Sequence, residues 1–230
     1  MSTLLNSFLS YPPDGPSGPS YTTGLLCRLT STVYAQDSSL TWDDQSGNGN
    51  HFVAPSAGTF PAFTSGYARF DGPSRGDRVI AGDFLTGKTS GEIFIRTGIP
   101  VSGGNSAGGD FGSDAQGDWQ NLGGTFYDSF GSTTRRSGTV GVSHGNWYTI
   151  GTWSASNDWA YRVDGTSKTT SGSNTVGWST APTLGYMVHS SSFANNYIAE
   201  VLIYDHKLGS TDRTSVESYL STLVSGSTPT

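Results

Sequence analysis

Four residues with hard oxygen ligands lie within one turn of the chain. They are Asp43, Asp44, Asn48 and Asn50, set among glycines and a serine. Carboxylate and amide oxygens are the ligands that Ca²⁺ takes in proteins, so a calcium site is one prediction for this turn. The spacing differs from that of an EF-hand loop, which ends in a bidentate glutamate. The same residue types also form ordinary tight turns without a metal, and this alternative stays open.

A second candidate site is a set of aromatic residues beside polar turn formers. Some of them follow a stretch from residue 98 to about 118 that has almost no apolar content, and others lie in later polar segments. Loops of this length are uncommon in compact domains unless they have a function. An aromatic ring can stack on a sugar face while neighbouring polar groups bind its hydroxyls. The predicted ligand-binding residues are Trp119, Phe126, Tyr127, Trp159 and Trp178.

No set of residues in the sequence predicts catalysis. Glutamate is scarce, with only Glu92, Glu200 and Glu217 in the chain. A retaining glycosidase needs two carboxyl groups close together, one of them tuned as an acid. The segment Gly141–Gly145 has the Gly-x-Ser-x-Gly spacing of a nucleophile elbow, but a predicted strand follows it where the elbow requires a helix. We therefore expect a protein that binds and is not an enzyme.

The composition narrows the class of partner. The chain of 230 residues carries a formal net charge of −6, 32 glycines and a single cysteine, Cys27. An acidic protein is repelled by phosphate backbones and anionic membranes, so we expect neither a nucleic acid nor a membrane as partner. The lone cysteine excludes an internal disulfide, and no apolar stretch is long enough to span a bilayer. The first residues lack the basic and apolar segments of a signal peptide.

Residues 1–20 differ in character from the rest of the chain. A short apolar piece is followed by Pro12, Pro13, Pro16 and Pro19, a density that a sheet interior does not tolerate. We expect a stiff arm or linker over 1–20, followed by one domain over 21–230. The arm either docks on a neighbouring subunit or forms a disordered tail. The residues predicted to dock are Leu4, Leu5, Phe8, Leu9 and Tyr11.

The pattern in the body of the chain predicts short strands joined by tight turns. The segment Gly91–Thr97 alternates between residue types, and 147–153 and 159–163 flank a turn, as in a hairpin. The scarcity of Glu and Lys argues against a helical protein. Near the end, a strand over 197–204 leads into a short helix. The apolar stripe predicted on that helix consists of Val216, Tyr219, Leu220 and Leu223.

Four short blocks of the sequence share features with one known family. The block Trp42–Asn50 contains a tryptophan, aspartates and a Ser-Gly-Asn turn, and Arg69–Gly72 contains a Phe-Asp-Gly turn. The block Asn146–Gly165 has a hairpin pattern that ends in Val-Asp-Gly, and residues 197–223 give the closing strand and helix. Together these blocks resemble the laminin-G-like branch of the concanavalin A-like lectin/glucanase superfamily. The resemblance covers about residues 25–223, apart from the polar stretch and the segment after it.

The resemblance implies an all-β fold, a two-sheet antiparallel jelly-roll sandwich of the concanavalin A-like type with a short C-terminal helix. The superfamily uses this fold for contact with glycans or proteins, and some members bind calcium near such turns. Its hydrolytic members carry a Glu-x-Asp-x-x-Glu strand motif, which this sequence lacks. Because one fold serves many functions, the resemblance predicts architecture more strongly than activity. No cofactor is expected apart from the calcium of the first turn.

Two functions are consistent with these features. The first is a non-catalytic virion surface protein, a phage capsid decoration or fibre-type module, which would reach the outside by lysis and need no export signal. The second is a free lectin-like carbohydrate-binding module. Capsid or other virion proteins would be partners of the first, and host surface glycans suit both. Exposed sandwich edges and the arm favour a homo-oligomer, and a trimer would suit a capsid three-fold axis.

Overall fold

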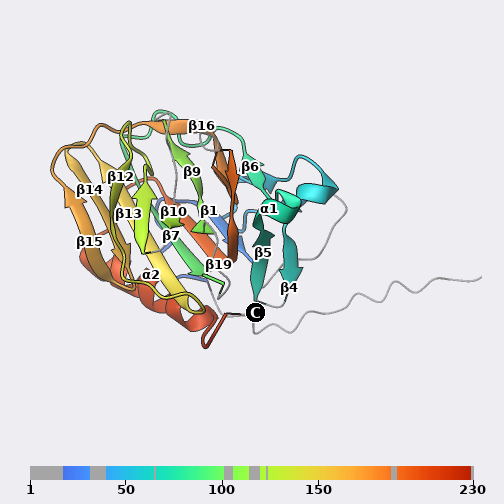
Figure 1. Ribbon diagram of the computed structural model, residues 1–230. Coiled ribbons are helices and arrows are strands. Elements are labelled where there is room, and N and C mark those ends of the chain that lie inside the picture. Colours follow the sequence, from blue (N-terminus) through green and yellow to red (C-terminus); the bar gives the residue numbers. More distant parts are fainter. Residues whose placement is uncertain are drawn as a thin grey trace, which may run out of the picture.

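The structure is a computed structural model of the 230-residue chain. It describes residues 18–31, 40–64, 66–100, 106–113, 120–122, 124–187 and 191–228. Within these residues the chain forms antiparallel sheets in a layered arrangement, with one long helix near the C-terminus (Figure 1). The predicted all-β sandwich with a C-terminal helix is confirmed.

One large sheet forms the first layer. Among the described residues it contains eight strands. Seven of them follow one another in space, in the order β15 (Thr166–Ser171), β14 (Asp158–Val163), β13 (Trp147–Ala155), β7 (Ser90–Gly98), β19 (Asn195–Tyr204), β5 (Tyr67–Asp71) and β4 (Ala62–Thr64). The eighth, β1 (Leu25–Thr30), pairs with the second half of β19, whereas β5 pairs with its first half. The long strands β7, β13 and β19 therefore form the middle of the layer.

The second layer consists of smaller sheets, and their strands are given for the described residues. The five-stranded sheet contains, in order, β2 (Thr41–Trp42), β3 (Phe52–Val53), β6 (Val79–Ala81), β16 (Trp178–Leu184) and β9 (Gly109–Gly112). The four-stranded sheet contains β12 (Arg136–Thr139), β11 (Thr125–Asp128), β10 (Gln120–Leu122) and β8 (Ser106–Ala107). The remaining short elements are β17 (Tyr186–Met187) paired with β18 (Ser192–Phe193), the 3₁₀ helix η1 (Ala57–Thr59) and helix α1 (Gly72–Arg75).

The hydrophobic core lies between the two layers. Side chains alternate along a strand, so one face of the large sheet turns Ile93, Ile95 and Ile150 inward. They belong to the same buried cluster as Trp42 and Phe52 of the second layer. Removal of this apolar surface from water is the main favourable term that holds the layers together.

The opposite face of the large sheet is covered by helix α2 (Ser210–Leu223), which runs along the outside of the sandwich in Figure 1. The predicted apolar stripe is confirmed, because Val216 and Leu220 are buried in one cluster with Phe94 and Leu202 of the sheet. The other two residues of the stripe pack against that cluster. Charged side chains are buried in the same interface, and the candidate site lies beside them.

Candidate functional site

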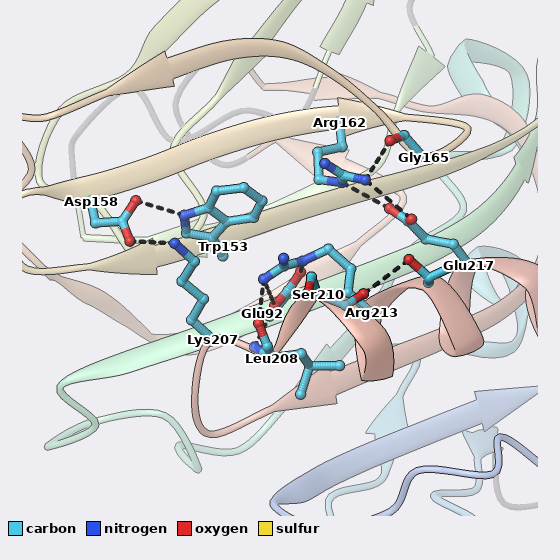
Figure 2. A network of polar contacts seen from close by, with 11 residues as sticks. Glu92, Trp153, Asp158, Arg162, Gly165, Lys207, Leu208, Ser210, Arg213 and Glu217 are labelled. Carbon is cyan, nitrogen blue, oxygen red and sulfur yellow. Dashed lines mark hydrogen bonds and ion pairs between the residues drawn. The ribbon is translucent and has the colours of Figure 1, made fainter.

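An ion pair fixes the start of α2 on the outer face of the large sheet (Figure 2). Glu92 of β7 is fully buried and accepts hydrogen bonds from Arg213 Nε at 2.5 Å and Arg213 Nη2 at 3.0 Å. The Leu208 amide donates to the same carboxylate at 2.7 Å. Burial raises the pKa of the Glu92 carboxyl, and the Arg213 guanidinium opposes that change. A carboxylate removed from water needs such partners, so the pair is a structural one.

The indole of Trp153 lies at the centre of the same network (Figure 2). The cationic groups of Arg213 and Lys207 lie 4.3 Å and 4.4 Å from its ring centroid. Its N–H donates to Asp158 at 2.9 Å, and Lys207 Nζ pairs with the other oxygen of Asp158 at 2.5 Å. Because the ring quadrupole attracts cations, these contacts attach the segment between β19 and α2 to strands β13 and β14.

Two further ion pairs lie at the interface, one between the sheet and the helix and one within the sheet. Arg162 of β14 donates to Glu217 of α2 through Nε at 2.9 Å and Nη2 at 3.2 Å (Figure 2). Toward β1, Arg28 pairs with the buried Glu200 at 2.9 Å, and the Tyr219 hydroxyl of α2 donates to the same carboxylate. Protein donors thus occupy these carboxylates, and the network stabilises the fold without offering a free carboxylate to a ligand.

Beside this network, a polar pocket opens between α2 and the large sheet. Its volume is about 420 Å³, within the range of small-molecule sites. Strands β7 and β13, the turn after β14 and one side of α2 supply the lining, which consists of Arg96, Trp147, Thr149, Asp164, Gly165, Thr214, Glu217, Ser218 and Ser221. The lining combines a guanidinium, two carboxylates, hydroxyl groups and one indole.

Arg96 of β7 is the buried cation of the pocket, with only 6% of the residue exposed. Its Nη2 donates to the Val224 carbonyl at 2.6 Å, and its Nη1 donates to Thr149 Oγ1 at 3.4 Å. Its Nε is buried and has no hydrogen-bond partner among the described residues. Burial lowers the pKa of this guanidinium, and the nearby Asp164 opposes that change. An unpaired buried N–H is rare in proteins, and this one has almost no accessible surface, so it is covered by the surrounding protein.

Asp164 faces Arg96 from the turn between β14 and β15. Asp164 and Gly165 have positive φ angles of 45° and 74°, as an Asp-Gly turn in a two-residue hairpin requires. Asp164 Oδ1 accepts a hydrogen bond from the Thr149 amide at 2.8 Å and lies 3.9 Å from Arg96 Nη1. The Asp164 side chain is 52% exposed, and no described residue donates to its Oδ2. The turn therefore fixes one carboxylate oxygen and leaves the other free to accept a hydrogen bond.

The chemistry of the pocket suits binding better than hydrolysis. A sugar hydroxyl both donates and accepts hydrogen bonds, so it matches a lining that offers an open carboxylate oxygen and serine and threonine hydroxyls. A glycosidase needs a carboxyl group that holds a proton for the leaving oxygen. Each carboxylate of this pocket instead faces a guanidinium, Asp164 that of Arg96 and Glu217 that of Arg162.

Three of the predicted ligand-binding aromatic residues lie in the core. Phe126 and Trp159 are fully buried, and Trp178 is 8% exposed. The Phe126 ring stacks on Tyr161 with ring centroids 3.9 Å apart, and the Trp178 indole N–H donates to the Lys88 carbonyl at 2.7 Å. These rings fill space between the layers and offer no face to a ligand. That part of the prediction is therefore corrected, because polar sequence neighbours did not imply an exposed side chain.

The other predicted binding residues keep their status as predictions. Tyr127 is half-buried, and the Arg135 guanidinium lies 4.7 Å from its ring centroid. It does not line the polar pocket. The residues that lie outside the described part of the chain are Trp119 and the predicted docking residues Leu4, Leu5, Phe8, Leu9 and Tyr11.

The predicted calcium turn is held by its own hydrogen bonds. The Asp44 carboxylate accepts three backbone N–H groups, from β1 and from the turn itself, at 2.8–2.9 Å. The side-chain amides of Asn48 and Asn50 donate to carbonyls of β1, and Asp43 lies 3.2 Å from His51. The described residues contain no group of three or more His, Cys, Asp or Glu residues that could hold a metal. These side chains attach the turn to β1, and calcium binding here stays a prediction.

The sequence did not predict the pocket, although its main residues belong to elements that the sequence does predict. Asp164 and Gly165 end the predicted Val-Asp-Gly hairpin, and Trp147 begins a predicted strand. Arg96 directly follows the apolar residues Ile93–Ile95 of the predicted strand, and an arginine inside a buried strand indicates that its charge has a partner or a ligand. What the sequence did not show is the pairing of β7 with β13, which brings Arg96 opposite Thr149.

No family model matches the sequence, and no curated protein matches it. Solved structures do match in fold. The botulinum neurotoxin serotype D/C VPI 5993 binding domain aligns with a TM-score of 0.60 and 12% identity, over 86% of this chain and 53% of that chain. Botulinum neurotoxin type C, whose cell entry depends upon interaction with two ganglioside molecules, aligns with a TM-score of 0.61 and 11% identity, over 86% and 52%. Trypanosoma rangeli sialidase in complex with sialic acid aligns with a TM-score of 0.63 and 13% identity, over 87% and 34%.

At these identities the likeness shows the fold alone. The chain spans about half the length of the toxin chains and about a third of the sialidase chain. It therefore has a β-sandwich of the kind found in those proteins, and the laminin-G-like assignment within that class stays a prediction. Among the described residues, no helix has both the length and the apolar character needed to cross a membrane.

Proposed function

We propose that this chain is a non-catalytic glycan-binding module. The observation that carries the proposal is the polar pocket, where the open Asp164 oxygen, hydroxyl groups of α2 and part of the Trp147 indole line one space. Such a set matches the hydroxyl groups and the apolar face of a sugar ring. The similar folds support the proposal, because they include a toxin that interacts with gangliosides and a sialidase in complex with sialic acid.

Binding of the intact chain to an array of immobilised glycans tests this function. Ser218 lines the pocket from the exposed side of α2, so Ser218→Trp should fill the pocket without disturbing the core. We expect it to weaken glycan binding about tenfold or more. Thr211→Trp, exposed in the first turn of the same helix and outside the lining, is the matched control and should bind as the wild type does. A folded wild-type chain that binds no glycan contradicts the proposal.

A second candidate function is that of a virion surface protein, a phage capsid decoration or fibre-type module. It is favoured by the proline-rich segment over residues 12–19, whose composition suits a stiff arm between a particle and the sandwich. The two functions are compatible, because a module on a virion surface can also bind host glycans. Sedimentation of the source material with detection of this chain tests the second function. Co-migration with a megadalton particle supports it, and a small free oligomer contradicts it.

A further inference from the structure

A second pocket lies where the described chain enters the sandwich, and it shares no residue with the polar pocket. Its volume is about 300 Å³, at the lower end of the range for small-molecule sites. Its walls come from the segment that begins at Gly18, from β1 with Arg28, and from the turn that contains Gln45 and Ser46. We infer that this second site, the Arg28 pocket, binds an acidic sugar, a uronic or sialic acid, by its carboxylate. The inference rests on the proposed glycan-binding function and extends it with a new site and a ligand class.

The Arg28 guanidinium has one amino group without a protein partner. Its Nε donates to Glu200 at 2.9 Å, and its Nη2 donates to the Tyr219 hydroxyl at 3.0 Å. Its Nη1 donates to no described residue, and 17% of the side chain is exposed. Arg28 is not among the described residues with a fully buried, unpaired side-chain nitrogen or oxygen. The Nη1 group can therefore reach a ligand in the pocket that Arg28 lines.

The surrounding protein fixes this guanidinium before any ligand binds. Glu200 is fully buried, so Arg28 cannot leave it without exposing an unpaired charge to the interior. A Cβ atom built at Gly18 would collide with Nη1, and glycine therefore lets the chain pass close to this group without covering it. A group that is fixed in advance loses little conformational entropy when a ligand arrives.

The charges around the Arg28 pocket favour an anionic ligand. Among the described residues that line it, Arg28 carries charge and none is an aspartate or glutamate. In the neighbouring turn, the Asp44 carboxylate accepts three backbone N–H groups, and Asp43 lies 3.2 Å from His51. A guanidinium has five N–H donors, so Arg28 can bind a ligand carboxylate while it keeps its bond to Glu200. Hydrogen bonds between two charged groups are about twice as strong as neutral ones.

The remaining polar groups of the lining suit the hydroxyls of a sugar ring. Thr22 and Gln45 are exposed and line the pocket. The Gln45 side-chain N–H₂ group has a single long contact, 3.4 Å to the Asp43 carbonyl. A hydroxyl and a carboxamide can each donate and accept, as a sugar hydroxyl requires. The pocket therefore offers a cation for the carboxylate and neutral groups for the ring.

Gln45→Glu tests the role of charge in this pocket. Glutamate has nearly the shape of glutamine, so the substitution changes the charge of an exposed side chain in the lining and leaves the core untouched. A carboxylate there should repel an acidic ligand. Asn157→Asp is the matched control, because it makes the same change from amide to carboxylate at an exposed residue outside both pockets. Aspartate also tolerates the positive φ of 57° at this position.

The measurement is calorimetric titration of the intact chain with methyl glucuronide, with the methyl ester of the same glycoside, and with acetate. The ester keeps the ring and removes the charge, whereas acetate keeps the charge and removes the ring. We expect the wild type to bind the acid about tenfold more tightly than the ester or acetate. Gln45→Glu should remove the preference for the acid over the ester, and Asn157→Asp should keep it. Ser218→Trp, which blocks the polar pocket, should keep it as well.

Several results would overturn the inference. Equal affinity of the wild type for the acid and the ester does so, and equal affinity for acetate shows that the sugar is not recognised. A preference for the acid that survives Gln45→Glu places the acidic ligand outside the Arg28 pocket. In each of these cases the proposed function stands if the chain binds neutral glycans on the array and Ser218→Trp weakens that binding. Absence of binding to every glycan overturns both.

Discussion

The buried carboxylates of the large sheet show how single residues fix the helix in place. Glu92 and Glu200 are fully buried on the outer face, and each pairs with an arginine, Arg213 and Arg28 respectively. A buried pair adds little net stability when compared with apolar residues of the same shape. Removal of one partner is costly, however, because the other charge then stays buried without compensation. The Glu92 pair therefore acts mainly on where α2 packs, whereas the Glu200 pair joins β1 to β19 and reaches α2 through the Tyr219 hydroxyl.

The first prediction concerns Glu92. Glu92→Ala should lower the free energy of unfolding by about 3–5 kcal/mol, because Arg213 stays buried without its partner. Asp158→Asn is the control from the same network, since the side chains of Asp158 and Lys207 are 44% and 35% exposed. It should cost about 1 kcal/mol or less. Denaturant unfolding of both variants measures the difference, and equal losses would contradict the prediction.

The second prediction concerns the pH dependence that Glu200 contributes. Burial raises the pKa of the Glu200 carboxyl above its ordinary value of 4.5, although the Arg28 guanidinium opposes that change. The folded state therefore holds this proton more tightly than the unfolded state. The resulting stability is complete below pH 4.5 and is lost as the pH rises through the folded pKa.

Glu200→Gln replaces the titrating carboxyl with an amide that binds no proton in this pH range, so the contribution of this group to the pH dependence of stability is lost. We expect the substitution to cost more unfolding free energy at pH 4 than at pH 7, as measured by denaturant unfolding at the two pH values. A cost that grows with pH would show that the folded pKa is lowered and would refute the prediction.

Among the elements, α2 covers the outer face of the large sheet and forms part of the candidate site. An isolated helix of 14 residues is marginal in water, so its stability depends on packing against the sheet. Its buried stripe and ion pairs supply that packing, and one of its sides lines the polar pocket. The same helix therefore closes the fold and forms one wall of the candidate site.

The third prediction concerns this packing. Leu220→Ala should lower the free energy of unfolding by about 2–5 kcal/mol, because it leaves a cavity against Phe94 and Leu202. Thr222→Ala lies on the exposed side of the same helix and should change stability by about 0.5 kcal/mol or less. Thermal and denaturant unfolding measure both. A loss for Leu220→Ala no larger than that of the control would mean that α2 is not part of the cooperative fold.

At the scale of the whole molecule, the chain consists of the sandwich and an N-terminal segment, residues 1–17, that lies outside the described residues. Tyr21, close to the first described residue, already contacts the sandwich. The Tyr204 hydroxyl donates to the Tyr21 carbonyl at 3.0 Å, and the Tyr21 hydroxyl lies 3.3 Å from His206 Nε2. These contacts do not require the preceding residues, so the fold and the predicted arm can be tested separately.

The fourth prediction follows from that separation. Deletion of residues 1–17 should leave the midpoint of thermal unfolding within about 3 °C of the intact chain, because the contacts of Tyr21 are retained. If the chain is a virion surface protein, the truncated form should no longer sediment with particles. Full attachment by the truncated protein would contradict the docking arm, and loss of the fold would contradict the independence of the sandwich.

The sequence by itself determined the class of fold and several local features. Strand alternation, turn residues such as Asp164 and Gly165, and the helical stripe around Val216 and Leu220 depend on neighbours a few positions away. Such features follow from backbone geometry and local spacing, and the structure confirms the sandwich and the helix that they predict.

Only the tertiary structure decided which side chains are free to bind. Trp159 and Phe126 have polar sequence neighbours, yet packing between the two layers buries both, because exposure depends on what packs across the sheet. The pocket joins Arg96, Asp164 and Ser218, which are distant in sequence, through strand pairing and helix docking. Long-range packing free energy sets these contacts, and no local pattern encodes them.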